Sequence, residues 1–543
     1  MSKNIISHTN YKSYLPLHQP NSIYINPTSP SEISLIISQM KNKKSPGDDM
    51  ISNDLIKYCN GVFSAIISHI ANCIIKTSIY PDSLKLGKII PIFKKGNTEE
   101  PSNYRPICLL SAVNKIVEKV LYKRLYGFFE KHGLIFDYQF GFRQAYSTTL
   151  ALIEITDEIR KEIEKRNITI GIYLDLTKAF DLVDHKILEY KLNRYGVRGS
   201  VLSLIKSYLM NRQQYTKING VKSSISGNIC GVPQGSVLGP LFFLVYLNDI
   251  QYCTNAKLRL YADDTNVFVT DKSPQVVKFK AEKCMQDIAE WLGANKLVLS
   301  QGKTKYSVFM PISKKIPTCL NSIKIDNTIV HRSTSCKYLG IHLDDKIRFD
   351  EHIHQLSKSL VKTISAFKII KNWIPDGLKL QLYFAYFHSK LQYGLEVYGS
   401  AAQKYIKQLE VLQHRALKTL FNLDPLTPSL PLLHRFKILT VHDLYKVKIS
   451  QFMHKQRTGK LPDMFSHYAN DLSDDKSYPN TRNRMKLYIP RMRTELGKRS
   501  IIYMGVKLWN ELIDVIDYEC FTKSEAVLVY RVRQYYLSKY VYN

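Results

Sequence analysis

Three aspartates at the ends of apolar strands restrict the possible folds of this chain more than any other feature. Asp175 follows the apolar run at residues 170–174, which predicts a buried strand. Asp263 and Asp264 lie at the polar tip between two β-rich runs in residues 258–269, a pattern typical of a hairpin. Spacing alone leaves open whether the three carboxylates meet.

The chemistry of these carboxylates depends on that convergence. An Asp-Asp pair taken alone is more often a solvated turn, because Asp is a favoured turn residue. Converging carboxylates raise each other's pKa unless a divalent cation neutralises them. Oxygen-only ligands suit Mg²⁺, and two such ions can activate a 3′-hydroxyl and stabilise a departing pyrophosphate. Convergence would therefore favour phosphoryl transfer on nucleotides.

The charge balance indicates a polyanionic partner. The 543 residues include 77 Lys and Arg against 46 Asp and Glu, a net charge of +31. Such an excess repels itself unless a polyanion binds, and nucleic acid is the expected one. An anionic membrane is the alternative, but the sequence has no signal peptide, lipidation signal or apolar run of bilayer length. The nine cysteines lack zinc spacing. We expect an intracellular protein without a zinc site or a membrane partner.

Pattern changes divide the chain into four parts. Residues 1–30 are polar and rich in proline, which predicts an extended or disordered lead-in. Residues 31–345 alternate helices with short strands irregularly, which favours an α+β fold over a regular βαβ repeat. Residues 346–423 have apolar residues at helical spacing throughout. The proline-spaced run at 424–431 predicts a linker to a mostly helical region, 424–543, of unknown role.

Several helices can be placed more closely. Residues 184–195 form a helical pattern that Gly196 ends. A longer apolar stripe begins at Ile353, and two further helices are expected at 378–398 and 402–422.

Seven blocks resemble the motifs of reverse transcriptases. The blocks around the aspartates, similar to motifs A, B and C, are IYLDLTKAFD at 172–181, GVPQGSVLGP at 231–240 and YADD at 261–264. The remaining four are NKIVEK at 114–119, QFGFR at 139–143, KTK at 303–305 (motif D) and YLG at 338–340 (motif E). QFGFR, together with YRPI at 104–107, resembles the jockey-type LINE-like (non-LTR) retrotransposons.

The resemblance implies a right-hand polymerase with fingers and palm at 31–345 and a helical thumb at 346–423. It implies an RNA-directed DNA polymerase that adds dNTPs to a DNA primer 3′-OH on an RNA template during retrotransposition. The implied cofactors are two Mg²⁺ ions, with Mn²⁺ as an alternative, and the implied location is the nucleus and cytoplasm. The alternatives are an RNA-dependent RNA polymerase and a catalytically silent, nucleic-acid-binding remnant of a mobile element. Relatives often carry an endonuclease, and we expect that activity to come from outside this chain.

The resemblance also assigns roles to residues near the aspartates. The implied metal ligands are the carboxylates of Asp175, Asp263 and Asp264, with the carbonyl of Leu176 as a further ligand. Lys303 becomes the general acid that protonates the leaving pyrophosphate.

Nucleotide binding is assigned to a second group. Phe180, five residues after Asp175, corresponds to a steric gate against a ribose 2′-hydroxyl, although an isolated Phe would be a core residue. Gln234 is expected to bond the sugar or base, and Gly235 to permit close backbone approach. Three basic residues are expected near the triphosphate, with the choice between the two lysines left open: Lys94, Lys95 and Arg105.

Binding of the primer–template is assigned to two further sets. Motif E, which grips the primer in this family, corresponds to Tyr338, Leu339 and Gly340. A basic face on the first thumb helix is expected to contact duplex phosphates, with a merely solvated face as the alternative. Its residues are Lys358, Lys362, Lys368 and Lys371.

Overall fold

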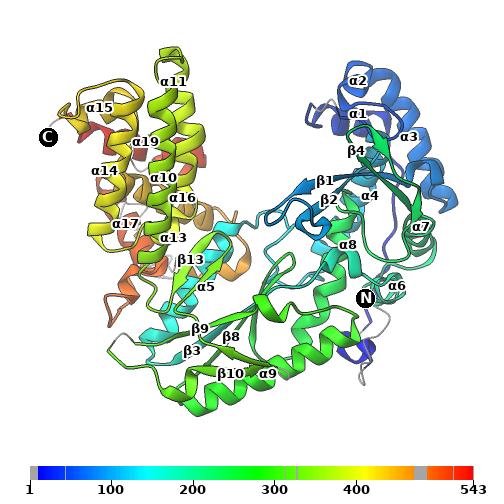
Figure 1. Cartoon of the computed structure of the whole chain (residues 1–543), viewed down its shortest axis with the longest axis horizontal. Coiled ribbons are helices and arrows are strands. Elements are labelled where there is room, and N and C mark those ends of the chain that lie inside the picture. Colours follow the sequence, from blue (N-terminus) through cyan, green and yellow to red (C-terminus); the bar gives the residue numbers. More distant parts are fainter. Residues whose placement is uncertain are drawn as a thin grey trace, which may run out of the picture. The chain divides into compact units, whose positions relative to one another are not determined.

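Helices and sheets are mixed along the chain, which confirms the α+β class (Figure 1). The computed structural model describes residues 10–16, 18–42, 45–311, 313–325, 328–469, 486–517 and 519–541. These residues divide into two units, each built from separate segments of the chain. The first unit draws on Met1–Phe142, Leu174–Thr265 and Lys283–Lys303, and the second on Arg143–Tyr173, Asn266–Glu282 and Thr304–Asn543.

A sheet of the first unit carries the predicted triphosphate contacts. Its strands are β1 Leu86–Phe93, β2 Tyr104–Leu109, β4 Gln213–Ile218, β5 Val221–Lys222 and β6 Ser226–Gly227. The strand order is β2-β1-β4-β5, with β6 also paired to β4. Strands β1 and β2 are antiparallel and pair from Lys88–Leu109 to Phe93–Tyr104, while β4 runs parallel to β1. Lys94 and Lys95 therefore follow directly where the β1–β2 pairing ends.

A second sheet explains why the aspartates meet. Its strands are β3 Ile168–Leu174, β7 Lys257–Tyr261, β8 Asp264–Asp271 and β9 Lys305–Phe309, in the order β7-β8-β3-β9. The hydroxyls of Thr169 and Thr270 lie 3.1 Å apart, which places the start of β3 beside the end of β8. Gly171 of β3 lies against Phe268 of β8, so the two strands run antiparallel. In this register Asp175, just after β3, lies opposite Asp264, the first residue of β8. The predicted strand and hairpin are thus confirmed.

Burial follows the sequence pattern in this sheet. Every residue of β3 is buried, as an unbroken apolar run predicts for a central strand.

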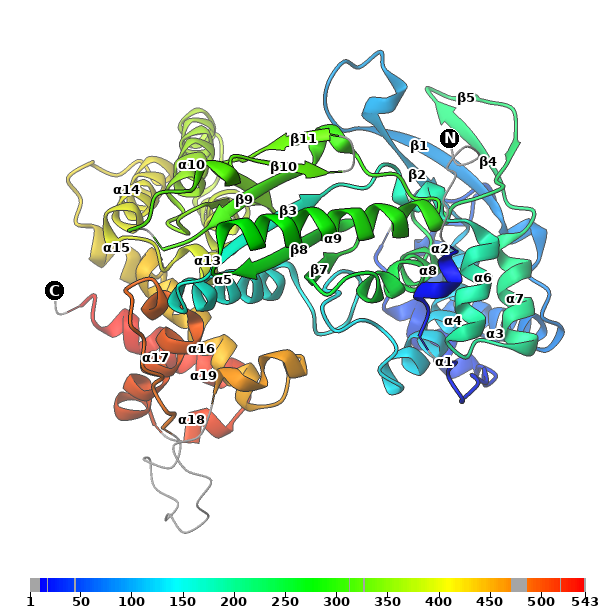
Figure 2. The ribbon, with the colours of Figure 1, turned by 90° about the horizontal axis from the view of Figure 1, so that it is seen from below.

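Helix α9 (Pro274–Ala294) lies along one face of the sheet (Figure 2).

The helices of the first unit form its core. They are α1 Pro30–Ser38, α2 Asn53–Tyr58, α3 Asn60–Thr77, α4 Ala112–Lys131, α6 His185–Arg194, α7 Gly199–Leu209 and α8 Leu238–Leu247. The predicted helix before Gly196 is α6, and the side chain of Asp184 caps its first turn. Helix α8, the longest apolar run, is almost entirely buried. In the described part of the chain, no helix has the length and apolar character needed to cross a bilayer.

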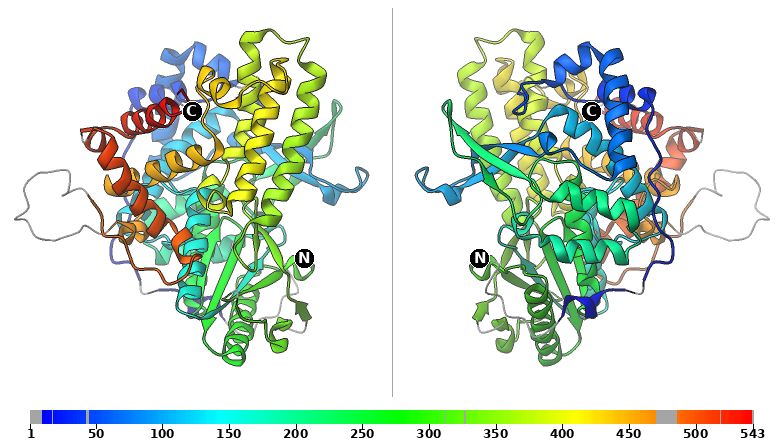
Figure 3. Two further views of the ribbon diagram at one scale, coloured as in Figure 1. Left: turned by 90° about the vertical axis from the view of Figure 1, so that its left-hand side faces the viewer. Right: turned by 90° about the vertical axis from the view of Figure 1, so that its right-hand side faces the viewer.

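The second unit is mainly helical after two small hairpins. The hairpins are β10 Ser322–Ile325 with β11 Thr328–His331, and β12 Ser335–Tyr338 with β13 Ile341–Asp344. Its helices are α5 Thr148–Glu164, α10 Asp350–Ile370, α11 Asp376–Leu382, α12 Ser389–Gln392, α13 Leu395–Tyr398, α14 Gln403–Leu420, α15 Ser429–Arg435, α16 Val441–Arg457, α17 Ile501–Val515, α18 Glu519–Thr522 and α19 Glu525–Ser538. Helices α10 and α14, in yellow-green and yellow, stand side by side (Figure 3).

Two expectations for this helical part need correction. The helix expected at 378–398 is divided: a π-helical turn at Tyr383–His388 interrupts it, and it breaks at Gly394, whose φ is +66°. A side chain at Gly394 would meet Ile341, so the break also brings the backbone close to β13. The run at 424–431 is not all linker, since α15 begins at Ser429. Pro431 is tolerated there because the first turn of a helix needs no backbone donor from it.

Buried polar contacts join α5 to residues 499–501, at the start of α17. Asp157 and Arg160 of α5 form an ion pair in which each side chain is only 2% exposed. The second Asp157 oxygen accepts the Ile501 N–H at 2.9 Å, and Arg160 donates to the Arg499 carbonyl at 2.9 Å. Burial raises the pKa of Asp157. Breaking such a pair leaves a buried charge without a partner, so residues 499–501 are part of the core of this unit.

The buried imidazole of His352 on α10 makes the stability of this unit dependent on pH. Burial, followed by the charges of His342 and Lys337, lowers the pKa of His352 to about 4. The unfolded chain, with an ordinary His pKa near 6.5, binds this proton more readily, so stability falls as the pH drops from about 6.5 towards 4. At pH 5 this group should lower the free energy of unfolding by about 2 kcal/mol.

Thermal unfolding at pH 7 and pH 5 measures this loss. His352→Phe should reduce the fall by about 2 kcal/mol, whereas His354→Phe, an exposed position on the same helix, should not. An unchanged pH dependence in the His352→Phe protein would contradict the assignment.

Candidate active site

The three aspartates lie close enough for their charges to interact. Burial raises the pKa of Asp264 to about 6, with further increases from the charges of Asp263 and Asp175 and an opposing effect from Lys94. The Asp264 side chain is open to water, yet the protein around it removes much of its hydration. Spacing alone left this convergence open, and the structure supplies it.

The donor set suits a hard divalent cation. All three side chains offer only carboxylate oxygens, and a cation between them would remove the repulsion that adds to burial in raising the pKa of Asp264. Within the described residues, no three His, Cys, Asp or Glu side chains are already gathered into a metal-holding group. The carboxylates therefore converge without forming a preformed cage.

Residues 298–303 lie beside Asp175 and contact it through the Lys303 side chain and through backbone hydrogen bonds. The Nζ of Lys303 lies 3.4 Å from Asp175 Oδ2, and both side chains are about half exposed, so the pair contributes little stability. The Asp175 carbonyl accepts the Ser300 N–H, and the Thr177 N–H donates to the Val298 carbonyl, each at 2.9 Å. Leu176 lies between them in an antiparallel bridge, so its own carbonyl faces away from that segment. The Lys303 ammonium group thus lies next to the Asp175 carboxylate. The Leu176 carbonyl takes no part in the hydrogen bonds of the bridge to Leu299.

The three basic residues expected at the triphosphate, Lys94, Lys95 and Arg105, are exposed. The Lys94 backbone N–H donates to the Asn103 carbonyl at 2.9 Å, and Arg105 pairs with Ile92 across the hairpin. Of the two lysines left open by the sequence, Lys94 is the one whose charge lowers the pKa of Asp264.

Phe180 is held by two other aromatic rings. Its ring stacks on Phe243 of α8, with centroids 4.3 Å apart, and meets Phe142 edge-on at 6.0 Å. Its carbonyl accepts the Val232 N–H at 2.9 Å, which links motif A to motif B. The ring is half-buried, so one part packs in the core and another remains accessible.

The motif B loop comes close to β2 and to motif A. Gly235 has φ +125°, and a Cβ there would lie 2.5 Å from the Cys108 carbonyl oxygen, so glycine is required. Gln234 accepts the Cys108 N–H through its backbone carbonyl at 2.8 Å. Its side-chain amide donates to Asp181 Oδ1 at 3.2 Å, which turns the amide nitrogen towards Asp181. Burial raises the pKa of Asp181.

Glu118, a residue of the NKIVEK block for which the sequence predicted no role, supports the same loop. This fully buried carboxylate accepts hydrogen bonds from Asn114, from the Tyr208 hydroxyl at 2.7 Å and from the Val237 N–H at 2.5 Å. A buried carboxylate needs such partners. Its position as the single acid among residues 112–129, a helical stretch rich in lysine, was the only sequence signal for it.

The predicted primer-gripping and thumb residues belong to the second unit. Tyr338 is buried at the end of β12, and Leu339 and Gly340 form the turn to β13 with φ +42° and +86°. The Leu339 carbonyl accepts the Tyr393 hydroxyl at 2.6 Å. The turn is therefore held by a residue that follows α12.

The thumb lysines differ in their surroundings. Lys358, Lys362 and Lys368 are exposed on α10. Lys371 is partly covered, and its Nζ donates to Asn422 at 2.6 Å. The solvent-facing basic surface is thus carried mainly by the first three.

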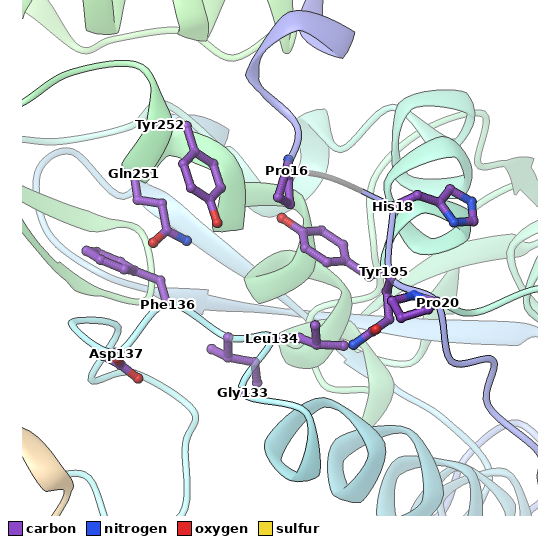
Figure 4. Close-up of a pocket in the computed structure, with 12 residues that line it drawn as sticks. Pro16, His18, Pro20, Gly133, Leu134, Phe136, Asp137, Tyr195, Gln251 and Tyr252 are labelled. Atoms are coloured by element: carbon purple, nitrogen blue, oxygen red, sulfur yellow. The ribbon is translucent and has the colours of Figure 1, made fainter.

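One pocket of the first unit is separate from these residues. It lies between the N-terminal segment and the loop after α4, with Tyr195 and Tyr252 among its lining side chains (Figure 4). None of the site residues predicted from the sequence lines it.

Comparisons with known proteins agree with the motifs. Residues 92–343 match the family model described as "Reverse transcriptase (RNA-dependent DNA polymerase)". The chain is 28% identical to the "RNA-directed DNA polymerase from mobile element jockey" of Drosophila melanogaster, over 75% of this chain and 45% of that protein. It is 27% identical to the "Probable RNA-directed DNA polymerase from transposon X-element" of the same species, over 77% and 47%.

The match to a solved structure is weaker. The crystal structure of the RNA-dependent RNA polymerase of a human picobirnavirus aligns with 62% of this chain and 61% of its own, at 12% identity and a TM-score of 0.32. That score is too low for an inference about fold. The chain spans about half the length of the curated relatives named above.

Proposed function

Because residues 92–343 belong to the reverse transcriptase family, we propose that this chain is an RNA-directed DNA polymerase of a jockey-type non-LTR retrotransposon. It adds dNTPs to a primer 3′-OH on an RNA template by phosphoryl transfer. The observation that carries the proposal is the strand arrangement that sets Asp175 opposite Asp264 and beside Asp263, where the charges of Asp263 and Asp175 add to the effect of burial on the pKa of Asp264. A nuclear and cytoplasmic location stays a prediction.

The three aspartates would hold two Mg²⁺ ions, with Mn²⁺ as an alternative. When bound, such ions activate the primer 3′-hydroxyl and stabilise the departing pyrophosphate. The Leu176 carbonyl is proposed as a further ligand. Lys303, whose Nζ lies 3.4 Å from Asp175 Oδ2, would donate a proton to the leaving pyrophosphate.

The remaining residues bind and select the nucleotide. Lys94 and Arg105, with Lys95 beside them, bind the triphosphate through charge and hydrogen bonds. Phe180 excludes a 2′-hydroxyl by overlap. Gln234 bonds the sugar or base, and since its amide nitrogen donates to Asp181, its oxygen would be the atom that accepts a hydrogen bond from the nucleotide.

Primer extension on a poly(A) template tests the proposal. With Mg²⁺ present, the protein should extend an oligo(dT) primer with dTTP and not with UTP. Extension with UTP instead would support an RNA-dependent RNA polymerase. Nucleic-acid binding without any extension would indicate a catalytically silent remnant.

The exposed lysines of α10 should bind duplex phosphates. Replacing Lys358 and Lys362 together with Gln should weaken binding to an RNA–DNA duplex. Each lost contact should reduce the slope of log affinity against log salt concentration by about 0.7–0.9. Fluorescence anisotropy at several salt concentrations measures this slope.

A matched pair of lysines controls for the loss of net charge. Lys498 and Lys523 are ion-paired on the surface with Glu495 and Glu519. Replacing both with Gln removes the same two charges and should leave the slope unchanged. Equal slopes in the α10 variant and the wild-type protein would mean that the α10 lysines only face solvent.

A further inference from the structure

Gln139 of the QFGFR block makes an unusual buried contact with the turn that carries the aspartates. Its side chain is only 2% exposed. The amide oxygen accepts two backbone N–H groups, from Gly141 at 2.9 Å and from Ala262 at 3.1 Å. Because both partners are donors, the orientation of the amide is fixed with its oxygen towards them.

The backbone around Gln139 follows β7 like an additional strand. Leu260 donates its N–H to the Tyr138 carbonyl at 2.9 Å, and its carbonyl accepts the Phe140 N–H at 2.7 Å. Gly141 then lies against the turn itself, since a Cβ there would be 2.3 Å from the Ala262 nitrogen. This approach brings the Gln139 side chain to Ala262, the residue immediately before Asp263.

Ala262 needs such a contact. Its φ is +57°, a left-handed conformation that residues other than glycine seldom adopt. Such a conformation persists only where the surrounding structure holds it. The hydrogen bond from Ala262 to Gln139 is a contact of this kind, and it comes from a residue far away in the sequence.

We infer that Gln139 is a positioning residue that holds the left-handed turn at Ala262 and thereby sets the direction of Asp263 and Asp264. It touches neither nucleotide nor metal in this role. The inference rests on the proposed function, because the direction of the two carboxylates matters for catalysis only if they hold the catalytic ions. No role for Gln139 followed from the motif in which it lies.

Gln139→Met tests this role, because methionine keeps the length and buried volume but accepts no comparable hydrogen bond. The variant should lower kcat about 10- to 100-fold and weaken Mn²⁺ binding by a similar factor, as losses of groups that orient metal ligands do. The KM for dTTP should change less than about three-fold, since the contacts to the nucleotide remain. Electron paramagnetic resonance of Mn²⁺, with a 3′-deoxy primer–template bound, gives the metal affinity without turnover.

A second substitution separates positioning from general damage. Glycine adopts positive φ without the penalty of a Cβ, so in an Ala262→Gly background the turn depends less on Gln139. The additional loss from Gln139→Met should then shrink to less than about three-fold in kcat and in Mn²⁺ affinity. Gln413, also fully buried and bonded twice through its amide, to Tyr383 and Leu439, supplies the control. Gln413→Met should lower thermal stability, and Ala262→Gly should not relieve its effect.

The measurements on these variants can overturn the assigned role of Gln139 in two ways. A folded Gln139→Met protein with unchanged kcat and Mn²⁺ affinity overturns the inference, and so does a loss that Ala262→Gly leaves undiminished. If the Met variant does not fold, Gln139→Asn, whose amide is one methylene too short to reach Ala262, gives the same comparison. A wild-type protein without polymerase activity would overturn the proposed function, while the Mn²⁺ titration would still test Gln139.

Discussion

Asp263→Asn and Asp175→Asn are each expected to lower primer extension by about 10³-fold or more, equivalent to about 4 kcal/mol of transition-state stabilisation. The amide keeps the shape of the carboxylate but removes the charge that a catalytic cation needs. The fold should be retained. Because one of the like charges near Asp264 is removed, the thermal midpoint measured without divalent ions should not fall in either variant.

Single-turnover extension with dTTP and Mg²⁺, beside RNA–DNA duplex binding and thermal unfolding, measures these effects. Asp271→Asn is the matched control, since Asp271 lies at the other end of β8 in an ion pair with Lys280, and its rate should stay within about three-fold. An Asp263→Asn or Asp175→Asn protein that kept more than a tenth of the wild-type rate would not have lost a metal ligand.

The parts of the fold that the sequence predicted well are those in which local pattern and tertiary environment agree. Strand β3 is apolar throughout because it is buried on both faces, and α6 ends where Gly196 takes φ +96°. The apolar stripe of α10, Ile353 to Phe367, is buried as its spacing predicts. In each case the information lies within a few consecutive residues.

Positions whose role depends on distant partners could not be predicted in this way. Glu118, Gln139 and Asp181 lie inside quoted motifs, but their partners Val237, Ala262 and Gln234 are dozens of residues further along the chain. A buried polar side chain has no periodicity of its own, so nothing nearby in the sequence shows what satisfies it. The same holds for the bond between Asp157 and Ile501.

The expected division of the chain was also limited by local reasoning. Prolines at 424–431 suggested a linker, but proline at the start of α15 is compatible with a helix. Boundaries at residues 30, 345 and 423 stay predictions, as do the roles assigned to individual site residues. Residues 470–485, within the expected C-terminal region, and residues 1–9, within the lead-in, lie outside the described residues.

Phe180→Val is expected to reduce the preference for dTTP over UTP by roughly 10- to 200-fold. The stacked contact with Phe243 and the edge contact with Phe142 fix the ring, and a fixed ring excludes a 2′-hydroxyl by overlap rather than by hydrogen bonding. A smaller side chain therefore opens space without removing a catalytic group. Addition of dTTP should remain measurable, and the change should arise mainly from faster incorporation of UTP.

Loss of core packing is the competing effect, because truncating a buried Phe can cost about 3–5 kcal/mol of stability. Phe129→Val, at a buried position on α4, is the matched control: it should lower the thermal midpoint and leave the dTTP/UTP ratio unchanged. Single-nucleotide kinetics with each nucleotide, beside thermal unfolding, separate the two effects. A folded Phe180→Val protein with the wild-type ratio would make Phe180 a core residue only. That result would remove the main structural reason for expecting the enzyme to make DNA rather than RNA.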